Sequence, residues 1–167
     1  MERNEHSAFE WDVDKELLGW QLPRSAVEIP SASVVAKRLS QSHPDWKTLR
    51  RLVGFRAGGY HREVVLRTPA CELVVAAWLP GQRSAIHDHG GSFGASLVVI
   101  GELHETRYLL QEDGNVRSIA FSVAPPGTVL VETQTTIHCM ENLSEAPALS
   151  VHLYAPPGAV PQTWRLG

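Results

Sequence analysis

The sequence predicts an all-β domain, an antiparallel β-barrel preceded by short helices. After about residue 60, strand-like segments are separated by turn-forming Gly, Pro, Asn and Asp residues. No helical pattern of useful length interrupts the series, whereas parallel strands need long crossover connections that are usually helical. The pairing is therefore expected to be antiparallel. We expect one domain over residues 1–167, with a helical segment at 1–55 packed on a barrel at 56–167.

Two short helices are expected in front of the barrel. The first covers residues 33–39 and is opened by Ser31 or Ser33 as its capping residue. The second covers residues 44–52, with Pro44 near its first position, where a missing amide hydrogen costs nothing.

The expected strands are short segments that alternate apolar and polar residues or form brief apolar runs. Asp113-Gly114, between two of these segments, is typical of a hairpin turn. The expected strands are Glu63–Thr68, Cys71–Leu79, Ser96–Ile100, Leu103–Leu110, Val116–Ser122, Val129–Glu132 and Ala148–Tyr154.

The composition argues against several kinds of partner. The 167-residue chain has a formal net charge of −3 and no basic run, so no nucleic-acid partner is expected. Cys71 and Cys139 lie far apart and indicate neither a disulfide framework nor a zinc finger. The charged first residues lack the apolar core of a signal peptide, and no run approaches the ~18 apolar residues of a membrane span. We expect a cytoplasmic protein without a membrane segment.

Three histidines are candidate metal ligands. His87 and His89 are two residues apart, so on a strand both side chains would point to one face. Imidazole nitrogens suit transition metals, although a bare pair of this kind is equally compatible with two solvated histidines in a loop. His138 follows a second turn and apolar run and can supply a third nitrogen.

Two further groups of residues can carry chemistry. Alternation places Ser150, His152 and Tyr154 on one face of a strand, where they would form a hydrogen-bonded row if that face is buried. The alternative is that this face is solvated and the intervening apolar residues point inward. Tyr60 and Arg62 also share a face, and arginine suits a two-point grip on a carboxylate, although most arginines simply lie on the surface.

The histidine segments resemble the paired motifs of the cupin superfamily, whose fold is a small antiparallel (jelly-roll) β-barrel with a metal in its mouth. The first motif is Gly81-x5-His87-x-His89-x4-Gly94-x6-Gly101, and the second is Pro125-x-Gly127 ahead of His138-x3-Asn142. Two departures stand out: Gly94 occupies a position where many cupins have a glutamate ligand, and the gap before His138 is longer than usual.

Residues 60–157 resemble the cysteine dioxygenase family of thiol dioxygenases within the cupins. The matching segments are Tyr60-x-Arg62, Trp78, Ser84-x-Ile86-His87-Asp88-His89, Gly101-x-Leu103-x-Glu105-Thr106, His138-x-x-Glu141-Asn142 and Ser150-x-His152-Leu153-Tyr154-x-Pro156-Pro157. The resemblance implies one Fe(II) per chain and a small thiol and O2 as substrates, with cysteine converted to its sulfinate.

The resemblance also implies roles for individual residues. It implies that His87, His89 and His138 hold the iron and that Arg62 grips the substrate carboxylate, with Tyr60 and an edge of Trp78 at the same pocket. Tyr154 would direct its hydroxyl toward the iron, oriented through His152 and Ser150, and this role is preferred to the rival reading of His152 as a metal ligand. Asp88 is expected to make loop hydrogen bonds, and His6, His43, His61 and His104 are expected to be solvated or structural.

Gly94 has a specific consequence under this resemblance. Animal members of the family have a cysteine there that forms a thioether with the active-site tyrosine, so the present chain is expected to lack the crosslink, as bacterial relatives do. Cys139 is no substitute, because it adjoins a metal ligand and should point off the ligand face.

Two alternative functions remain open. Dioxygenases for 3-mercaptopropionate tend to carry Gln at the position of Arg62 and an arginine beyond the active-site tyrosine, a role for which Arg165 is the candidate. The third possibility is a cupin that binds metal and ligand without catalysis.

Overall fold

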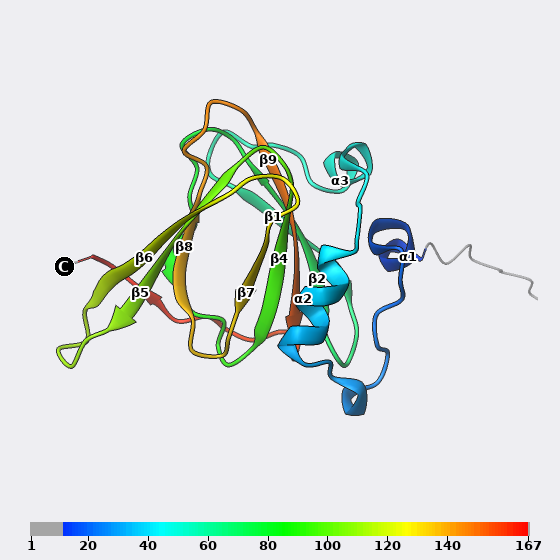
Figure 1. Ribbon diagram of the computed structural model, residues 1–167, viewed down its shortest axis with the longest axis horizontal. Coiled ribbons are helices and arrows are strands. Elements are labelled where there is room, and N and C mark those ends of the chain that lie inside the picture. Colours follow the sequence, from blue (N-terminus) through cyan, green and yellow to red (C-terminus); the bar gives the residue numbers. More distant parts are fainter. Residues whose placement is uncertain (1–11, 167) are drawn as a thin grey trace, which may run out of the picture.

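A computed structural model describes residues 12–166 and shows two five-stranded antiparallel sheets packed face to face (Figure 1). The first sheet has the order β1 (His61–Arg67), β2 (Glu72–Trp78), β9 (Ala148–Ala155), β4 (Phe93–Ile100), β7 (Val129–Glu132). The second has the order β10 (Thr163–Trp164), β3 (Ile86–His87), β8 (Ile137–Glu141), β5 (Leu103–Leu110), β6 (Val116–Ala124). The predicted all-β class and antiparallel jelly-roll are confirmed.

The predicted strands agree with those observed to within three residues at each end. The strands that were not predicted are β3, β8 and β10, the first and last of which have two residues each. β3 and β10 are too short for alternation to appear in the sequence, so only their pairing partners define them as strands. Strand β8 (Ile137–Glu141) has five residues, and the sequence analysis did not assign it as a strand.

Three short α-helices precede the sheets: α1 (Val13–Leu18), α2 (Ala32–Ser40) and α3 (Trp46–Leu52), with a 3-10 turn at Ala26–Glu28. The expected cap is confirmed in α2, where the Ser31 side chain accepts a hydrogen bond from the Val34 amide. In α3 the prediction for Pro44 is wrong. Asp45 is the capping residue and its carboxylate accepts from the Thr48 amide, so Pro44 lies before the helix rather than in its first turn.

The helices cover the outer face of the first sheet (Figure 1). Leu17 of α1 and Leu39 of α2 belong to one apolar cluster with Val151 and Leu153 of β9. As a result β2 and β9 are buried on both faces, one against the helices and the other toward the interior between the sheets.

No helix in the part of the chain that the structure describes is long and apolar enough to cross a membrane. Residues 1–11, including His6 and the start of the expected helical segment, lie outside the described range.

Because the helices share a core with the first sheet, we expect the chain to unfold as one domain. Leu39 is 0% exposed, so Leu39→Ala should lower the free energy of unfolding by about 2–5 kcal/mol. Val34 lies in the same helix but is 44% exposed, so Val34→Ala should change the free energy of unfolding by less than ~0.5 kcal/mol. Denaturant unfolding followed by circular dichroism and by tryptophan fluorescence measures both effects. Separate transitions for helices and sheets would contradict the single-domain prediction.

Candidate functional site

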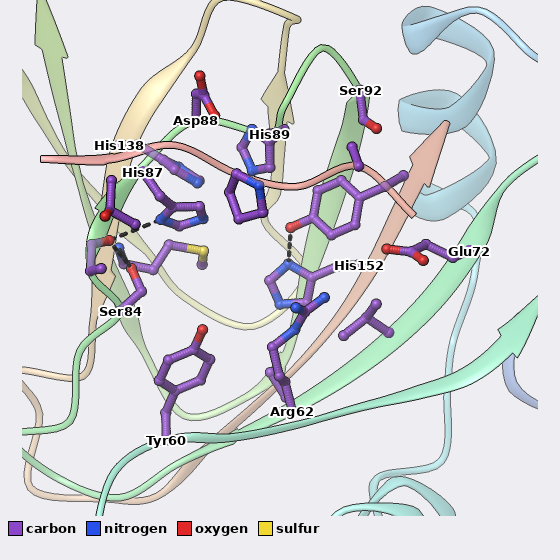
Figure 2. Close-up of a pocket in the computed structure, with 18 of the residues that line it drawn as sticks. Tyr60, Arg62, Glu72, Ser84, His87, Asp88, His89, Ser92, His138 and His152 are labelled. Carbon is purple, nitrogen blue, oxygen red and sulfur yellow. Dashed lines mark hydrogen bonds between the residues drawn. The ribbon is translucent and has the colours of Figure 1, made fainter. Parts of the chain in front are cut away.

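A cavity of about 230 Å³ opens between the two sheets (Figure 2). Its walls come from β2 and β9 of one sheet, β3 and β8 of the other, and the segment that follows β9. It brings together the predicted metal ligands, Tyr60, Arg62, Trp78, His152 and Tyr154, while Ser150 lies behind Trp78 and His152. Residues of the wall that the sequence did not single out for chemistry include Glu72, Val74, Ala76, Ser92, Met140, Ala159, Pro161 and Thr163.

The three candidate metal ligands converge at one wall of this cavity. His87 and His138 are directly paired across β3 and β8, and their ring centroids are 4.9 Å apart. The ring of His89 lies 5.2 Å from that of His87 and 4.9 Å from that of His138. One nitrogen from each ring can be chosen so that all three lie within 4.8 Å of one another.

The three histidines are brought together differently from what the sequence predicted. Strand β3 ends at His87, and His89 lies beyond it in the loop leading to the turn at Gly90 and Gly91. The expectation that His87 and His89 share a strand face is therefore wrong, although the two side chains do meet. The loop brings His89 back to the cavity, and strand pairing brings His138.

The ring nitrogens are arranged as a metal site requires. His138 donates from Nδ1 to Glu105 at 2.8 Å, and His87 donates from Nδ1 to the Ala85 carbonyl at 2.9 Å. Each of these rings keeps Nε2 for another partner. Both nitrogens of His89 are buried without a hydrogen-bond partner in the described structure. Because a buried unpaired polar atom is costly, His89 fits a metal ligand better than a structural residue.

Burial keeps two of these imidazoles neutral. It lowers the pKa of His87 to about 4 and that of His89 to about 2, and the electrostatic effect of the neighbouring imidazole acts in the same direction. Neutral imidazole is the form that binds metal, so no proton has to be displaced from these two rings at neutral pH.

Two buried carboxyl groups lie behind His138. Glu105 accepts from His138 through one oxygen and from Arg107 through the other at 2.9 Å. Burial alone would raise the pKa of Glu105, but these hydrogen bonds outweigh it and the pKa is lowered. Since both oxygens are committed, Glu105 orients His138 and leaves no atom free for the metal.

The second buried carboxyl, Glu132, was not predicted from the sequence. Ser96 donates to one of its oxygens at 2.6 Å, and the other has no partner in the described structure. Burial raises the pKa of Glu132 to about 7, so it can hold a proton near neutral pH. Glu132 ends the apolar run Val129–Val131 in β7, and nothing in that short run indicated that its side chain points inward.

The predicted row on β9 forms a continuous hydrogen-bonded chain inside the molecule. Trp78 donates from Nε1 to Ser150 at 2.9 Å, Ser150 lies 2.8 Å from His152 Nε2, and His152 Nδ1 lies 3.0 Å from the Tyr154 hydroxyl. Ser150 and His152 are buried, which excludes the alternative of an outward, solvated row. Both nitrogens of His152 are occupied, so the rival role as a metal ligand has no support. Burial lowers the pKa of His152 to about 3 and raises that of Tyr154.

Tyr60 and Arg62 point into the cavity from the side opposite His89 and Asp88 (Figure 2). The rings of Tyr60 and Trp78 stack with centroids 4.2 Å apart, which fixes the orientation of the phenol. Within the described residues, the Arg62 guanidinium makes no hydrogen bond or ion pair with another protein group. An unpaired guanidinium in a cavity fits an anionic ligand. The other candidate, Arg165, does not line the cavity.

Gly94 is packed too closely against β9 to carry a side chain. A Cβ atom added there would lie 2.3 Å from the Leu153 carbonyl oxygen and 2.7 Å from a ring carbon of Tyr154. Cys139 does not line the cavity and packs with Ile86 in a separate apolar cluster. Neither position therefore provides a thiol that reaches the tyrosine ring.

The segment after β9 lines the cavity and is held by hydrogen bonds to Asp88, in the loop that carries His89. Asp88 accepts from the amides of Gly90 at 3.0 Å and Gln162 at 2.8 Å, and its own amide donates to the Gln162 carbonyl. Asp88 thus makes the loop hydrogen bonds expected of it. His61 is also structural as expected, since its ring contacts the Gly54 carbonyl.

Comparison with known proteins agrees with this site. The profile of the family described as cysteine dioxygenase type I matches residues 24–164. Cysteine dioxygenase type 1 of Danio rerio is 33% identical over 128 residues, covering 70% of this chain and 60% of that protein. The Bos taurus protein of the same description is 24% identical over 136 residues, covering 78% of this chain and 66% of that protein. The chain thus spans less than two thirds of the length of either relative.

A solved structure supports the fold. A conserved protein with a double-stranded β-helix domain from Klebsiella pneumoniae is similar with a TM-score of 0.55 and 25% identity. The similarity covers 70% of this chain and 88% of that one.

If Glu105 orients His138, removing the negative charge of Glu105 should weaken metal binding while the three histidine ligands stay the same. Glu105→Gln should lower the affinity for a divalent transition metal by about 10- to 100-fold. Glu102→Gln is the matched control, because Glu102 is more exposed and contacts His104 outside the cavity. Competition with a chelating dye under anaerobic conditions measures both affinities. Equal affinities for the two variants would show that Glu105 has no part in the site.

Proposed function

The chain belongs to the cysteine dioxygenase type I family of the cupin superfamily, and on this premise we propose that it is an iron-dependent thiol dioxygenase. The proposed substrate is L-cysteine, and the proposed product is cysteine sulfinate carrying both atoms of O2. The proposed cofactor is one Fe(II) per chain.

One observation carries this proposal: three chemically different groups meet in a single cavity. His87, His89 and His138 offer uncommitted nitrogens, Arg62 offers an unpaired positive charge, and Tyr154 offers a hydroxyl held by the β9 row. A metal, an anionic group and a hydrogen-bond acceptor can therefore be bound next to one another.

The donor set suits the proposed ion. His87, His89 and His138 would hold it, and all three are neutral nitrogen donors of the kind that bind iron. No carboxylate belongs to this trio, so the full charge of the ion would remain available to an anionic substrate. When bound, Fe(II) would supply the redox chemistry that activates dioxygen and the positive charge that favours the substrate thiolate.

Arg62 would bind the substrate carboxylate through its planar, two-pronged guanidinium. This contact would fix one end of a small thiol acid while its sulfur lies at the histidine wall. Holding both reactants in a fixed orientation is the contribution that such a cavity makes to the rate.

The hydrogen-bonded row would leave the Tyr154 hydroxyl hydrogen free for the reacting groups. The Trp78 indole can only donate, so the Ser150 hydroxyl accepts a hydrogen bond from it. The same hydroxyl then donates a hydrogen bond to His152 Nε2. Neutral His152 then carries its hydrogen on Nδ1 and donates it to the Tyr154 oxygen. The Tyr154 hydrogen would point into the cavity, and its raised pKa keeps it in place.

Arg62 is also the observation that favours cysteine over 3-mercaptopropionate. The relatives specific for 3-mercaptopropionate tend to use an arginine beyond the active-site tyrosine, and Arg165 does not line the cavity. Arg62 does line it, beside the Tyr60–Trp78 stack.

Oxygen uptake by protein loaded anaerobically with Fe(II) tests the proposed function. We expect uptake with L-cysteine, with one O2 consumed for each thiol converted to a sulfinate identified by mass. Faster uptake with 3-mercaptopropionate would favour the second function. A protein that binds iron and thiol without consuming oxygen would be a non-catalytic cupin, and the proposal would be wrong.

Arg62→Ala should raise the KM for cysteine by about ten- to a hundredfold, because hydrogen bonds to charged groups contribute roughly 1.5–3 kcal/mol. Arg62→Lys should recover only part of this loss, since lysine lacks the planar fork. Steady-state kinetics with Arg165→Ala as the matched control measures the effect. A larger KM increase for Arg165→Ala than for Arg62→Ala would mean that the carboxylate anchor is misassigned.

Tyr154→Phe should keep iron and substrate binding but lower kcat by about 10²- to 10³-fold, because only an oriented donor is removed. The unsubstituted protein should show a single intact mass with no two-dalton loss, since Gly94 leaves no thiol for a crosslink. Kinetics, metal analysis and mass spectrometry provide the three readouts. Full turnover in Tyr154→Phe would assign the β9 row a purely structural role.

A further inference from the structure

Met140 has the largest non-aromatic apolar side chain of those that line the cavity. The other residues of this kind in the wall are smaller, namely Val74, Ala76, Ala85, Ala159 and Pro161. Met140 lies two residues after His138 on β8, and both line the cavity, whereas Cys139 between them packs in a separate apolar cluster. Met140 is therefore next to the candidate metal site on the same face of the strand.

The neighbours of Met140 hold it in place. Its carbonyl accepts a hydrogen bond from the Ser84 amide at 2.9 Å, and its amide donates to the Ser84 hydroxyl at 3.0 Å. Met140 is 2% exposed and belongs to one apolar cluster with Trp78 and Leu130. Because protein interiors are close-packed, its side chain can leave the cavity wall only by displacing these neighbours.

Met140 lies between the groups that would hold the two ends of a substrate. His138 adjoins it along β8, and Tyr60 packs against the cluster that contains it. Tyr60 points into the cavity beside Arg62, on the side opposite the histidines (Figure 2). A thiol acid with its carboxylate at Arg62 and its sulfur at the histidines would therefore have its carbon chain against Met140.

We propose that Met140 determines which thiol acids the cavity accepts, by limiting the carbon chain between sulfur and carboxylate to the length found in L-cysteine. This inference rests on the proposed function, because it takes the substrate to be a thiol acid held by Arg62 and the histidines. The additional methylene of L-homocysteine would have to enter the volume that Met140 fills. One methylene in an apolar pocket changes selectivity by about 10- to 200-fold.

Equilibrium binding of thiols to the cobalt(II)-loaded protein, without oxygen, tests this role. The measured quantity is the dissociation constant for L-homocysteine divided by that for L-cysteine, each obtained from the absorption of the bound cobalt. Met140→Ala should lower this ratio by about tenfold or more, since it opens space for the longer chain. Met140→Leu keeps most of the volume and should leave the ratio close to that of the unsubstituted protein.

Leu130→Ala is the matched control, because Leu130 is buried in the same cluster but does not line the cavity. It should leave the ratio unchanged, and circular dichroism should show that each variant is folded. If Met140→Ala does not fold, Met140→Val removes less volume and should still lower the ratio.

A folded Met140→Ala or Met140→Val protein with an unchanged ratio would overturn the proposal. An equal decrease in Leu130→Ala would do the same, and so would a cobalt-loaded protein that binds neither thiol. Oxygen uptake has no part in this measurement. A chain that binds thiols with the expected selectivity but consumes no oxygen would refute the proposed activity and leave the role of Met140 intact.

Discussion

The placement of β8 between β3 and β5 is the constraint on which the rest of the site depends. Strand pairing sets His138 opposite His87 on one side and opposite Arg107 on the other. The same register turns His138 toward Glu105 and turns Cys139 away from the cavity. A slip of one residue would exchange these two faces, removing a nitrogen from the candidate metal site and leaving the buried Glu105 with only one of its two donors.

The layer of helices has a consequence for chemistry as well as for stability. The helices bury the outer face of β9, and on its inner face the side chains of Ser150 and His152 are buried as well. Ser150, His152 and Tyr154 must therefore satisfy one another, and Trp78 supplies the donor at the end of the row. These bonds fix the orientation of the Tyr154 hydroxyl on the inner face of the sheet.

The cavity contains polar groups that no other part of the described chain satisfies, and these groups indicate bound partners. Among the described residues, both nitrogens of His89 lack hydrogen bonds and Arg62 lacks a counter-charge, which suits a metal and an anionic ligand. Polar groups that lack a hydrogen-bond or charge partner within the protein are expected where the protein binds something else.

From the sequence, turn residues and alternation predicted an antiparallel all-β domain and placed Ser150, His152 and Tyr154 on one strand face, because these are local properties of the chain. Spacing made the three histidines candidate metal ligands, and the resemblance of the motifs to the cupins implied the jelly-roll. The sequence could not decide which face of β9 is inward, since both faces proved to be buried and alternation distinguishes only a wet face from a dry one. It misplaced His89 on a strand and did not identify Glu132 as a buried acid. Those features depend on which distant segments pack together, and only the tertiary structure determines that contact.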